Sequence, residues 1–255
     1  MACHTRSNSF PSRPHPIIQE VDEHLCRLRS SESTSTSSST ISHKLSGLQE
    51  LHDCVDRLLQ LPLNQQALAQ EKHQKCANEL LDGSLRLLDV CSTAKDALLQ
   101  TKECMQNLQS IIRRRRGEES EVLSSEIKKY LNSRKIVKKA IRKAMNLKGM
   151  KTSSLNNDQE TIAIVSKLRD VEAVSFTIFE SVLSFISGPK IACDEEEVNA
   201  FAEVDAALKS LKNADNAQNH LSNLESCIQD QEEGLESLFR QLIKTRVSLL
   251  NILDH

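Results

Sequence analysis

The sequence is poor in the residues that make turns and aromatic clusters. Its 255 residues include only 6 glycines, 5 prolines, 6 phenylalanines and 1 tyrosine, and there is no tryptophan. Antiparallel β folds need frequent turn residues and draw on aromatic and β-branched side chains, so this composition argues against a β-sandwich or β-barrel. Leucine, serine, lysine, glutamate and glutamine are abundant instead, and most of these residues favour helices. The composition therefore predicts an all-α fold.

The sequence also lacks an apolar run of about 18 or more residues, the length that a helix needs to cross a bilayer. The nearest approach, residues 174–187, is interrupted by Glu180 and is predicted to be a core helix. There is no secretory signal, and none of the eight cysteines is spaced as C-x-x-C. We therefore expect reduced thiols and a cytoplasmic location.

Motifs of enzymes and metal sites are missing as well. There is no glycine-rich phosphate loop, no G-x-S-x-G elbow and no H-E-x-x-H helix. His73 and Cys76 are one helical turn apart, but no second pair at zinc-ligand spacing accompanies them. We therefore predict a protein that is not an enzyme, with no catalytic residue, no metal and no cofactor.

The clearest positive signal is a heptad-like repeat in three long segments, in which apolar or small residues recur at alternating steps of four and three. This repeat keeps one stripe of a helix facing a partner helix, the condition for knobs-into-holes packing. It predicts an elongated antiparallel helical bundle with coiled-coil-like long helices, and the same stripes leave a homo-oligomer open. The stripes are Leu80, Ser84, Leu87, Cys91, Ala94, Leu98, Thr101, Met105, Leu108 and Ile112; Ile164, Leu168, Val171, Ser175, Ile178, Val182 and Phe185; and Leu221, Leu224, Ile228, Gln231, Leu235, Leu238, Leu242, Thr245, Leu249 and Ile252.

Breaker and capping residues set the predicted boundaries. Residues 1–41 are predicted to be a disordered, flexible tail rich in Ser and Pro, with a short helix near 17–29 and a Ser/Thr linker over 30–42. Residues 42–255 are predicted to form a single helical-bundle domain, whose first helix stops at Pro62. The later helices are predicted to start at an Asn64 N-cap, after Gly117, at the Asn157 and Glu160 capping box, and near Asp194. They are predicted to stop at Ile112, at Gly149 and at the Gly188 and Pro189 pair. A break in the last helix is predicted near Asn213, Asn216 and Asn219.

Charge is distributed very unevenly along the chain. The net charge of −2 combines a near-neutral segment over residues 1–111, a segment of +10 over 112–151 and a segment of −10 over 152–255. The middle segment is predicted to place a basic surface on one helix. That surface consists of Arg113, Arg114, Arg115, Arg116, Lys128, Lys129, Arg134, Lys135, Lys138, Lys139, Arg142 and Lys143.

Four interpretations of the basic segment are open. Acidic helices of the same bundle would neutralise it internally, or it would be a solvated face. An anionic membrane surface would bind it as a cationic amphipathic helix. Nucleic acid is disfavoured as a partner, because Tyr130 is the only aromatic residue in the segment and single-strand binders usually offer several stacking side chains.

The N-terminal tail carries one short docking motif. Arg6, Ser7, Ser9 and Pro11 fit the pattern R-S-x-S-x-P. A basophilic kinase would phosphorylate Ser9, and the arginine cluster of a 14-3-3 adaptor would then bind the phosphate. A chance match in a serine-rich tail is one alternative. An organelle transit peptide is another, because the first acidic residue is Glu20.

Several longer segments together resemble a known family. They are RSNSFPSRPHP, DCVDRLLQLPL, ELLDGSLRLLDVCSTAKDALLQTKE, SIIRRRRG, LSFISGPK and ESLFRQLIKTRVSLLNILDH, which are spread over nearly the whole chain. They look like the plant-specific BYPASS-type family, a domain of unknown function. The resemblance implies a land-plant protein that acts in root and shoot development by restraining a mobile root-derived signal. It implies no catalytic residue, and some members are described as plastid or membrane-associated.

Together these observations predict a non-enzymatic helical interaction protein that acts in plant developmental signalling. Its partners are expected to be proteins that bind through the heptad stripes or the phosphorylated tail. The alternative is a peripheral membrane protein that uses the basic amphipathic helix over residues 113–143.

Overall fold

The computed structural model describes residues 15–31, 37–70, 74–114, 120–146, 161–188, 199–210 and 214–253. These ranges contain eight α-helices and no β-strand, which confirms the predicted all-α fold. The helices are α1 (Pro16–Ser30), α2 (Ser38–Leu59), α3 (Pro62–Leu68), α4 (Gln74–Arg114), α5 (Ser120–Asn146), α6 (Thr161–Ser187), α7 (Ala200–Ser210) and α8 (Ala214–Leu253).

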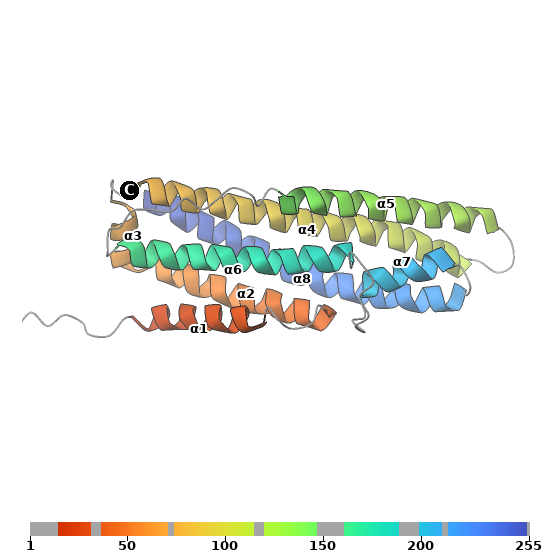
Figure 1. Ribbon diagram of the computed structural model, residues 1–255, viewed down its shortest axis with the longest axis horizontal. Helices are drawn as coiled ribbons and strands as arrows, with labels where there is room; N and C mark the ends of the chain where they lie inside the picture. The colour runs from red at the N-terminus through yellow and green to blue at the C-terminus, as the bar shows by residue number, and fades with distance from the viewer. Residues whose placement is uncertain are drawn as a thin grey trace, which may run out of the picture.

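Two long helices, α4 and α8, run antiparallel through the whole length of the rod (Figure 1), and they share the most extensive interface between helices. Helices α6 and α5 pack one after the other along α4, while α2 and α7 pack along α8. The molecule is therefore an elongated antiparallel bundle with four helices in cross-section. Helices α2 and α6 complete one half of it, and α5 and α7 complete the other.

The predicted heptad stripes form the core of this bundle. Every predicted stripe position in α4, α6 and α8 is buried, except Ile112, which is half-buried at the end of α4. Three of the stripe hydroxyls donate to carbonyls of their own helix: Ser84 to Leu81 at 2.7 Å, Thr101 to Ala97 at 2.8 Å and Ser175 to Val171 at 2.7 Å. These polar residues therefore fit an apolar stripe without unpaired hydroxyl protons.

Helix α1 packs on the outside of the bundle against α2 and α6. It buries Ile17, Val21, Leu25 and Leu28. Exposed ion pairs surround this contact, including one of 2.7 Å between Arg57 and Glu20, but pairs of this kind contribute little to stability. Apolar burial is therefore what holds α1, the short helix that the sequence places in the N-terminal segment, against the bundle.

The predicted serine-rich linker over residues 30–42 is partly wrong. Helix α2 already begins at Ser38, and the Ser37 side chain accepts a hydrogen bond from the Thr40 amide as its N-cap. Serine is unfavourable inside helices but favoured at the N-cap, where its hydroxyl satisfies a free amide. Ile41 is fully buried in the first turns of the helix. Capping and burial therefore outweigh the polar composition.

The predicted Asn64 cap is also wrong. Pro62 occupies the first turn of α3, and Asn64 lies inside that helix, where its side-chain amide donates to the Leu58 carbonyl at 2.8 Å. Proline is well suited to the first turn of a helix, because its missing N–H has no intrahelical partner there. Helix α4 is a separate element that begins at Gln74.

The predicted last helix is two helices. Helices α7 and α8 are separate and pack against each other, which confirms the predicted break. The predicted start at Asp194 lies outside the described residues, as do Gly117, Gly149, Asn157 and Glu160. Gly188 ends α6 as predicted: its φ of 79° is left-handed, and its amide donates to the Ser184 and Phe185 carbonyls.

A buried histidine lies where α2 faces α6. His52 is 2% exposed, and its Nε2 is 3.0 Å from the Ser175 hydroxyl oxygen. Because that hydroxyl donates its proton to the Val171 carbonyl, Nε2 must be the protonated nitrogen, and Nδ1 carries the free lone pair. Burial lowers the pKa of His52 from 6.5 to about 4. The folded protein therefore holds this imidazole neutral.

This burial predicts an acid sensitivity that depends on His52. Between pH 6.5 and 4 the unfolded chain binds a proton that the folded chain refuses, so the free energy of unfolding falls as the pH falls through this window. We expect His52→Leu to reduce the loss of unfolding free energy between pH 7 and 4.5 by about 2 to 3 kcal/mol. Urea unfolding at the two pH values measures this difference, and equal losses in variant and wild type would contradict the assignment.

Candidate functional site

The basic segment folds mainly into α5, whose two sides differ in character. One side buries Leu123, Ile127, Tyr130, Val137 and Ile141, chiefly against α4. The opposite side carries most of the lysines of the segment. Because residues three and four apart share a helix face, the sequence spacing alone separates these two sides. The helix is therefore anchored by its apolar side and presents its charges outward.

Arg134 is an exception to the predicted basic surface, because it lies in the interior. Its side chain is 2% exposed, and its Nε donates to the Asp205 carboxylate of α7 at 3.3 Å. Its Nη2 donates to the Ile186 carbonyl of α6 at 2.7 Å, and its guanidinium lies 4.9 Å from the centre of the Phe201 ring. A buried guanidinium is tolerated only with such partners. Arg134 therefore joins α5 to α6 and α7, and its assignment to the surface is wrong.

Two further cations of α5 have acidic partners. Lys138 is half-buried and donates to the same Asp205 carboxylate at 2.9 Å. Lys129 is exposed and pairs with Glu126 of its own helix at 2.5 Å. Internal neutralisation, one of the four interpretations of the basic segment, therefore applies to only part of its charge.

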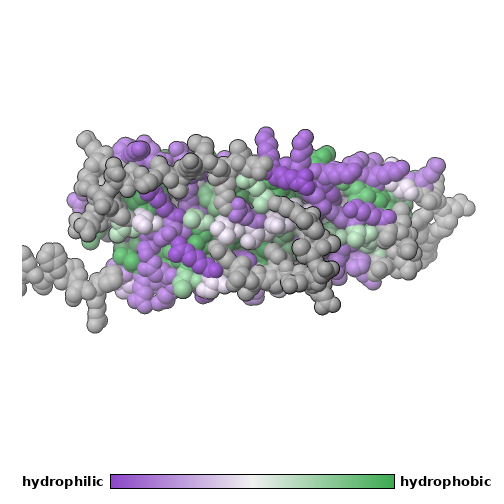
Figure 2. Space-filling view, in the orientation of Figure 1, coloured by the Kyte–Doolittle hydropathy of each residue, from purple (hydrophilic) through white to green (hydrophobic). Residues whose placement is uncertain are grey.

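Five cations of α5 are exposed and form no ion pair with any residue that the structure describes. We call this set the α5 cationic face, and in Figure 2 hydrophilic side chains gather over α5 along the upper right edge of the molecule. Exposed apolar side chains are interspersed with it: Ile136 is 60% exposed and Val122 is 43% exposed. The face consists of Lys128, Lys135, Lys139, Arg142 and Lys143.

Of the remaining predicted site residues, the structure describes only Arg113 and Arg114. Arg113 and Arg114 are exposed at the C-terminal end of α4, not on α5. Arg115 and Arg116 lie outside the described residues, and so does the whole tail motif of Arg6, Ser7, Ser9 and Pro11, whose phosphorylation and 14-3-3 binding stay predictions.

Tyr130 is fully buried beneath the cationic face. Its side chain is 1% exposed, and burial raises the pKa of its hydroxyl above the ordinary value for tyrosine. A nucleic-acid base has no access to this ring, so the only aromatic residue of the basic segment offers no stacking surface.

A family model described as Protein BPS1 matches residues 44–252, which cover most of α2, all of α3 to α7, and α8 up to Ile252. The chain belongs to the BPS1 family. No curated protein and no solved structure matches the chain. This membership agrees with the BYPASS-type resemblance of the sequence, and the matched region contains the whole α5 face.

The described residues of this BPS1-family chain offer no metal centre. None of them forms a group of three or more histidine, cysteine, aspartate or glutamate side chains that would hold an ion. None of the described helices is both long and apolar enough to cross a bilayer.

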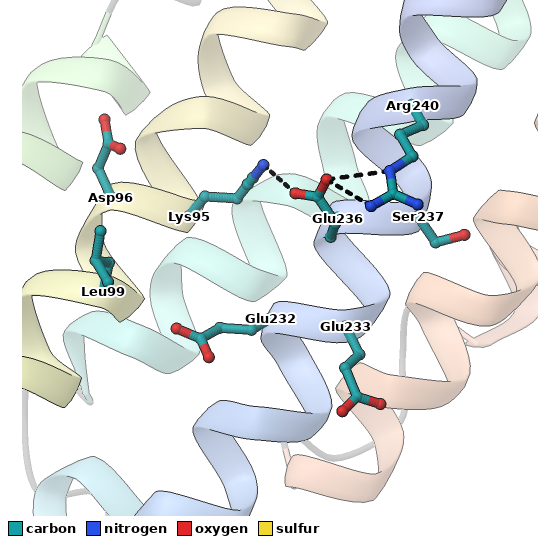
Figure 3. Close-up of a pocket in the computed structure, with 8 residues that line it drawn as sticks. All are labelled: Lys95, Asp96, Leu99, Glu232, Glu233, Glu236, Ser237 and Arg240. Atoms are coloured by element: carbon teal, nitrogen blue, oxygen red, sulfur yellow. Dashed lines mark hydrogen bonds and ion pairs between the residues drawn. The ribbon is translucent and has the colours of Figure 1, made fainter.

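A surface hollow of about 550 Å³ lies between α4 and α8, and no sequence pattern indicated it. Asp96 and Leu99 line it from α4, and Glu233 and Arg240 lie across from them on α8 (Figure 3). The Lys95 and Glu236 side chains form an ion pair between these two sides.

Asp96 belongs to a longer row of acids on the outer side of α4. All of its members are exposed, and none forms an ion pair with a described residue. The sequence shows the uniform spacing of seven residues, but only the structure shows that all four acids lie on the exposed side of α4. This α4 acidic stripe consists of Asp82, Asp89, Asp96 and Glu103.

The burial of Arg134 predicts that adjacent cations of α5 differ sharply in their effect on stability. Arg134→Met should lower the free energy of unfolding by roughly 3 kcal/mol, because Asp205 stays buried with one partner fewer. The same change at exposed Lys135 should alter it by about 0.5 kcal/mol or less. Chemical unfolding of the two variants measures the difference, and equal effects would refute the buried pair.

Proposed function

We propose that this chain is a non-enzymatic helical interaction protein that acts in plant root and shoot development. The α5 cationic face is proposed as its contact surface for an acidic protein partner. Membership of the BPS1 family supports the developmental context. The physical support comes from the one observation that this face keeps five exposed cations without an acidic partner among the described residues.

Several other cations of the bundle have an acidic partner. Arg57 pairs with Glu20, Lys102 with Glu232, and Arg169 with Glu79. On α5, by contrast, Lys139 lies one turn from Lys135 and one turn from Lys143, and none of these three forms an ion pair with a described residue. Like charges at this spacing repel each other by a few tenths of a kcal/mol per pair. An acidic partner would replace this repulsion by attraction.

The rigidity of α5 supports the same function. Its apolar side is held in the bundle, and Arg134 fixes it to α6 and α7. The exposed cations therefore project from a helix that needs no folding step on binding, which lowers the entropic cost of recognition.

The second candidate function is peripheral binding to an anionic membrane, which Ile136 favours. A side chain that is 60% exposed between lysines would enter the interfacial region while the lysines contact acidic lipid headgroups. The main apolar side of α5 is unavailable for this, because it packs against α4. Such binding would therefore be mainly electrostatic.

The proposed function predicts that neutralising α5 removes partners that an equal change elsewhere keeps. We expect the triple variant Lys135→Gln, Lys139→Gln and Lys143→Gln to lose specific proteins in quantitative affinity purification from plant tissue. The matched control Lys75→Gln, Lys209→Gln and Arg113→Gln removes the same charge from exposed positions outside α5 and should retain them. An identical protein set for both variants would contradict a contact surface on α5.

The same two variants separate a protein partner from a membrane. Co-sedimentation with phosphatidylcholine vesicles, with and without phosphatidylserine, measures lipid binding directly. Binding that requires phosphatidylserine and is lost only in the α5 variant would establish the second candidate. No binding of wild type to either vesicle would exclude it.

A further inference from the structure

Two rows of charged side chains that form no ion pair with a described residue lie on the outside of the bundle and share one spacing. In the α4 acidic stripe the carboxylates recur every seven residues, at Asp82, Asp89, Asp96 and Glu103. On the α5 cationic face Lys128, Lys135 and Arg142 also recur every seven residues. Seven residues of helix span about 10 Å, so consecutive charges are equally far apart in both rows.

We propose that the α5 cationic face binds the α4 acidic stripe of a second copy of this chain. This inference rests on the proposed function in one respect, that the α5 face is a contact surface, and it names the partner. Two helices that lie side by side with the same charge spacing bring three cations opposite three acids at once. This is the way in which flanking charges select partners in coiled coils.

The two rows do not satisfy each other within one molecule. Helix α5 contacts its own α4 through its buried apolar side, while Lys128, Lys135 and Arg142 are on the exposed side. No ion pair joins the cationic face to the acidic stripe among the described residues. The cationic face and the acidic stripe can therefore attract each other only when they belong to two different molecules.

Apolar side chains accompany the charges on both surfaces. Ile136 directly follows Lys135 and is 60% exposed, and Leu99 lies one turn after Asp96 and is 52% exposed. Leu99 lines the hollow between α4 and α8 shown in Figure 3, which would receive an apolar side chain flanked by lysines. Burial of these two residues adds an attraction that salt does not screen.

The strength of this contact should depend on salt. Exposed ion pairs each contribute little, and added salt screens them. We expect weak self-association in sedimentation velocity at low ionic strength, with a dissociation constant that rises about tenfold or more when the salt is raised to near 0.5 M. A chain that stays monomeric at low salt over the whole soluble concentration range would overturn the proposal.

Charge reversal with mixing tests which surfaces are used. The acidic-stripe variant Asp89→Lys with Asp96→Lys, and the cationic-face variant Lys135→Glu with Lys139→Glu, should each stay monomeric. Mixed together, they should associate within about threefold of the wild-type dissociation constant, because each supplies the surface that the other has lost. Circular dichroism of each variant checks that the helices are intact.

A matched control removes the effect of net charge alone. The variant Lys75→Glu with Lys209→Glu has the same net charge as the cationic-face variant but leaves α5 unchanged. Because both proposed surfaces are unaltered in this control, it should self-associate on its own with a dissociation constant close to that of the wild type, whereas the cationic-face variant alone should stay monomeric. Equal loss of self-association in the control and in the cationic-face variant would overturn the assignment to α5. If wild type is monomeric while the α5 variant still loses partners from plant tissue, self-association fails and the proposed function stands.

Discussion

The interface between α4 and α8 is the constraint on which the rest of the bundle depends. These two helices are the only described ones that run the full length of the rod, and their stripes of leucine and small residues hold them together without interruption. At the centre the contact is close enough for the Cys91 thiol to approach the Leu235 carbonyl at 3.7 Å. A second side of each long helix packs against two shorter helices that follow one another along it: α6 and α5 along α4, and α2 and α7 along α8. The outer sides of α4 and α8 receive none of them, so the acidic stripe and the hollow beside it are exposed.

The junction between the two halves of the rod depends on a polar contact. Helix α7 begins beside the end of α6, where the Asn199 amide donates to the Phe185 carbonyl. Arg134 reaches this point from α5 and contacts both helices. The Phe185 and Phe201 rings pack edge to face there, with their ring centres 5.6 Å apart. A buried ion pair is a poor source of stability, because desolvation offsets most of its attraction. We therefore assign it the role of fixing how α5 lies against α6 and α7, which apolar contacts alone would leave free to slide.

The stripes of α4, α6 and α8 could be predicted from the sequence because a heptad repeat is a local property of one helix. The predictions that are wrong concern residues whose position depends on a contact with a residue far away in the sequence. The polar composition around Ser38 indicated a linker, but Ile41 gains a place in the core and extends the helix. Arg134 was assigned to the surface because cations are usually exposed, and nothing near it in the sequence shows that Asp205 lies opposite. The same limit applies to the candidate site: the sequence located the basic segment, but only the folded structure separates the five cations without a described acidic partner from Lys129, Arg134 and Lys138, which have one.

The burial of the apolar side of α5 also restricts what the α5 cationic face can bind. In the folded chain the apolar side of α5 is covered by α4, so insertion into a bilayer as an amphipathic helix would require breaking the Arg134 contacts and exposing Tyr130. What is left outside is a line of cations about 20 Å long with Ile136 among them. A good partner must therefore offer negative charges spaced along a line, with an apolar side chain near its middle. A fluid lipid surface supplies the charges without the spacing, whereas the acidic stripe of α4 with Leu99 beside it supplies both.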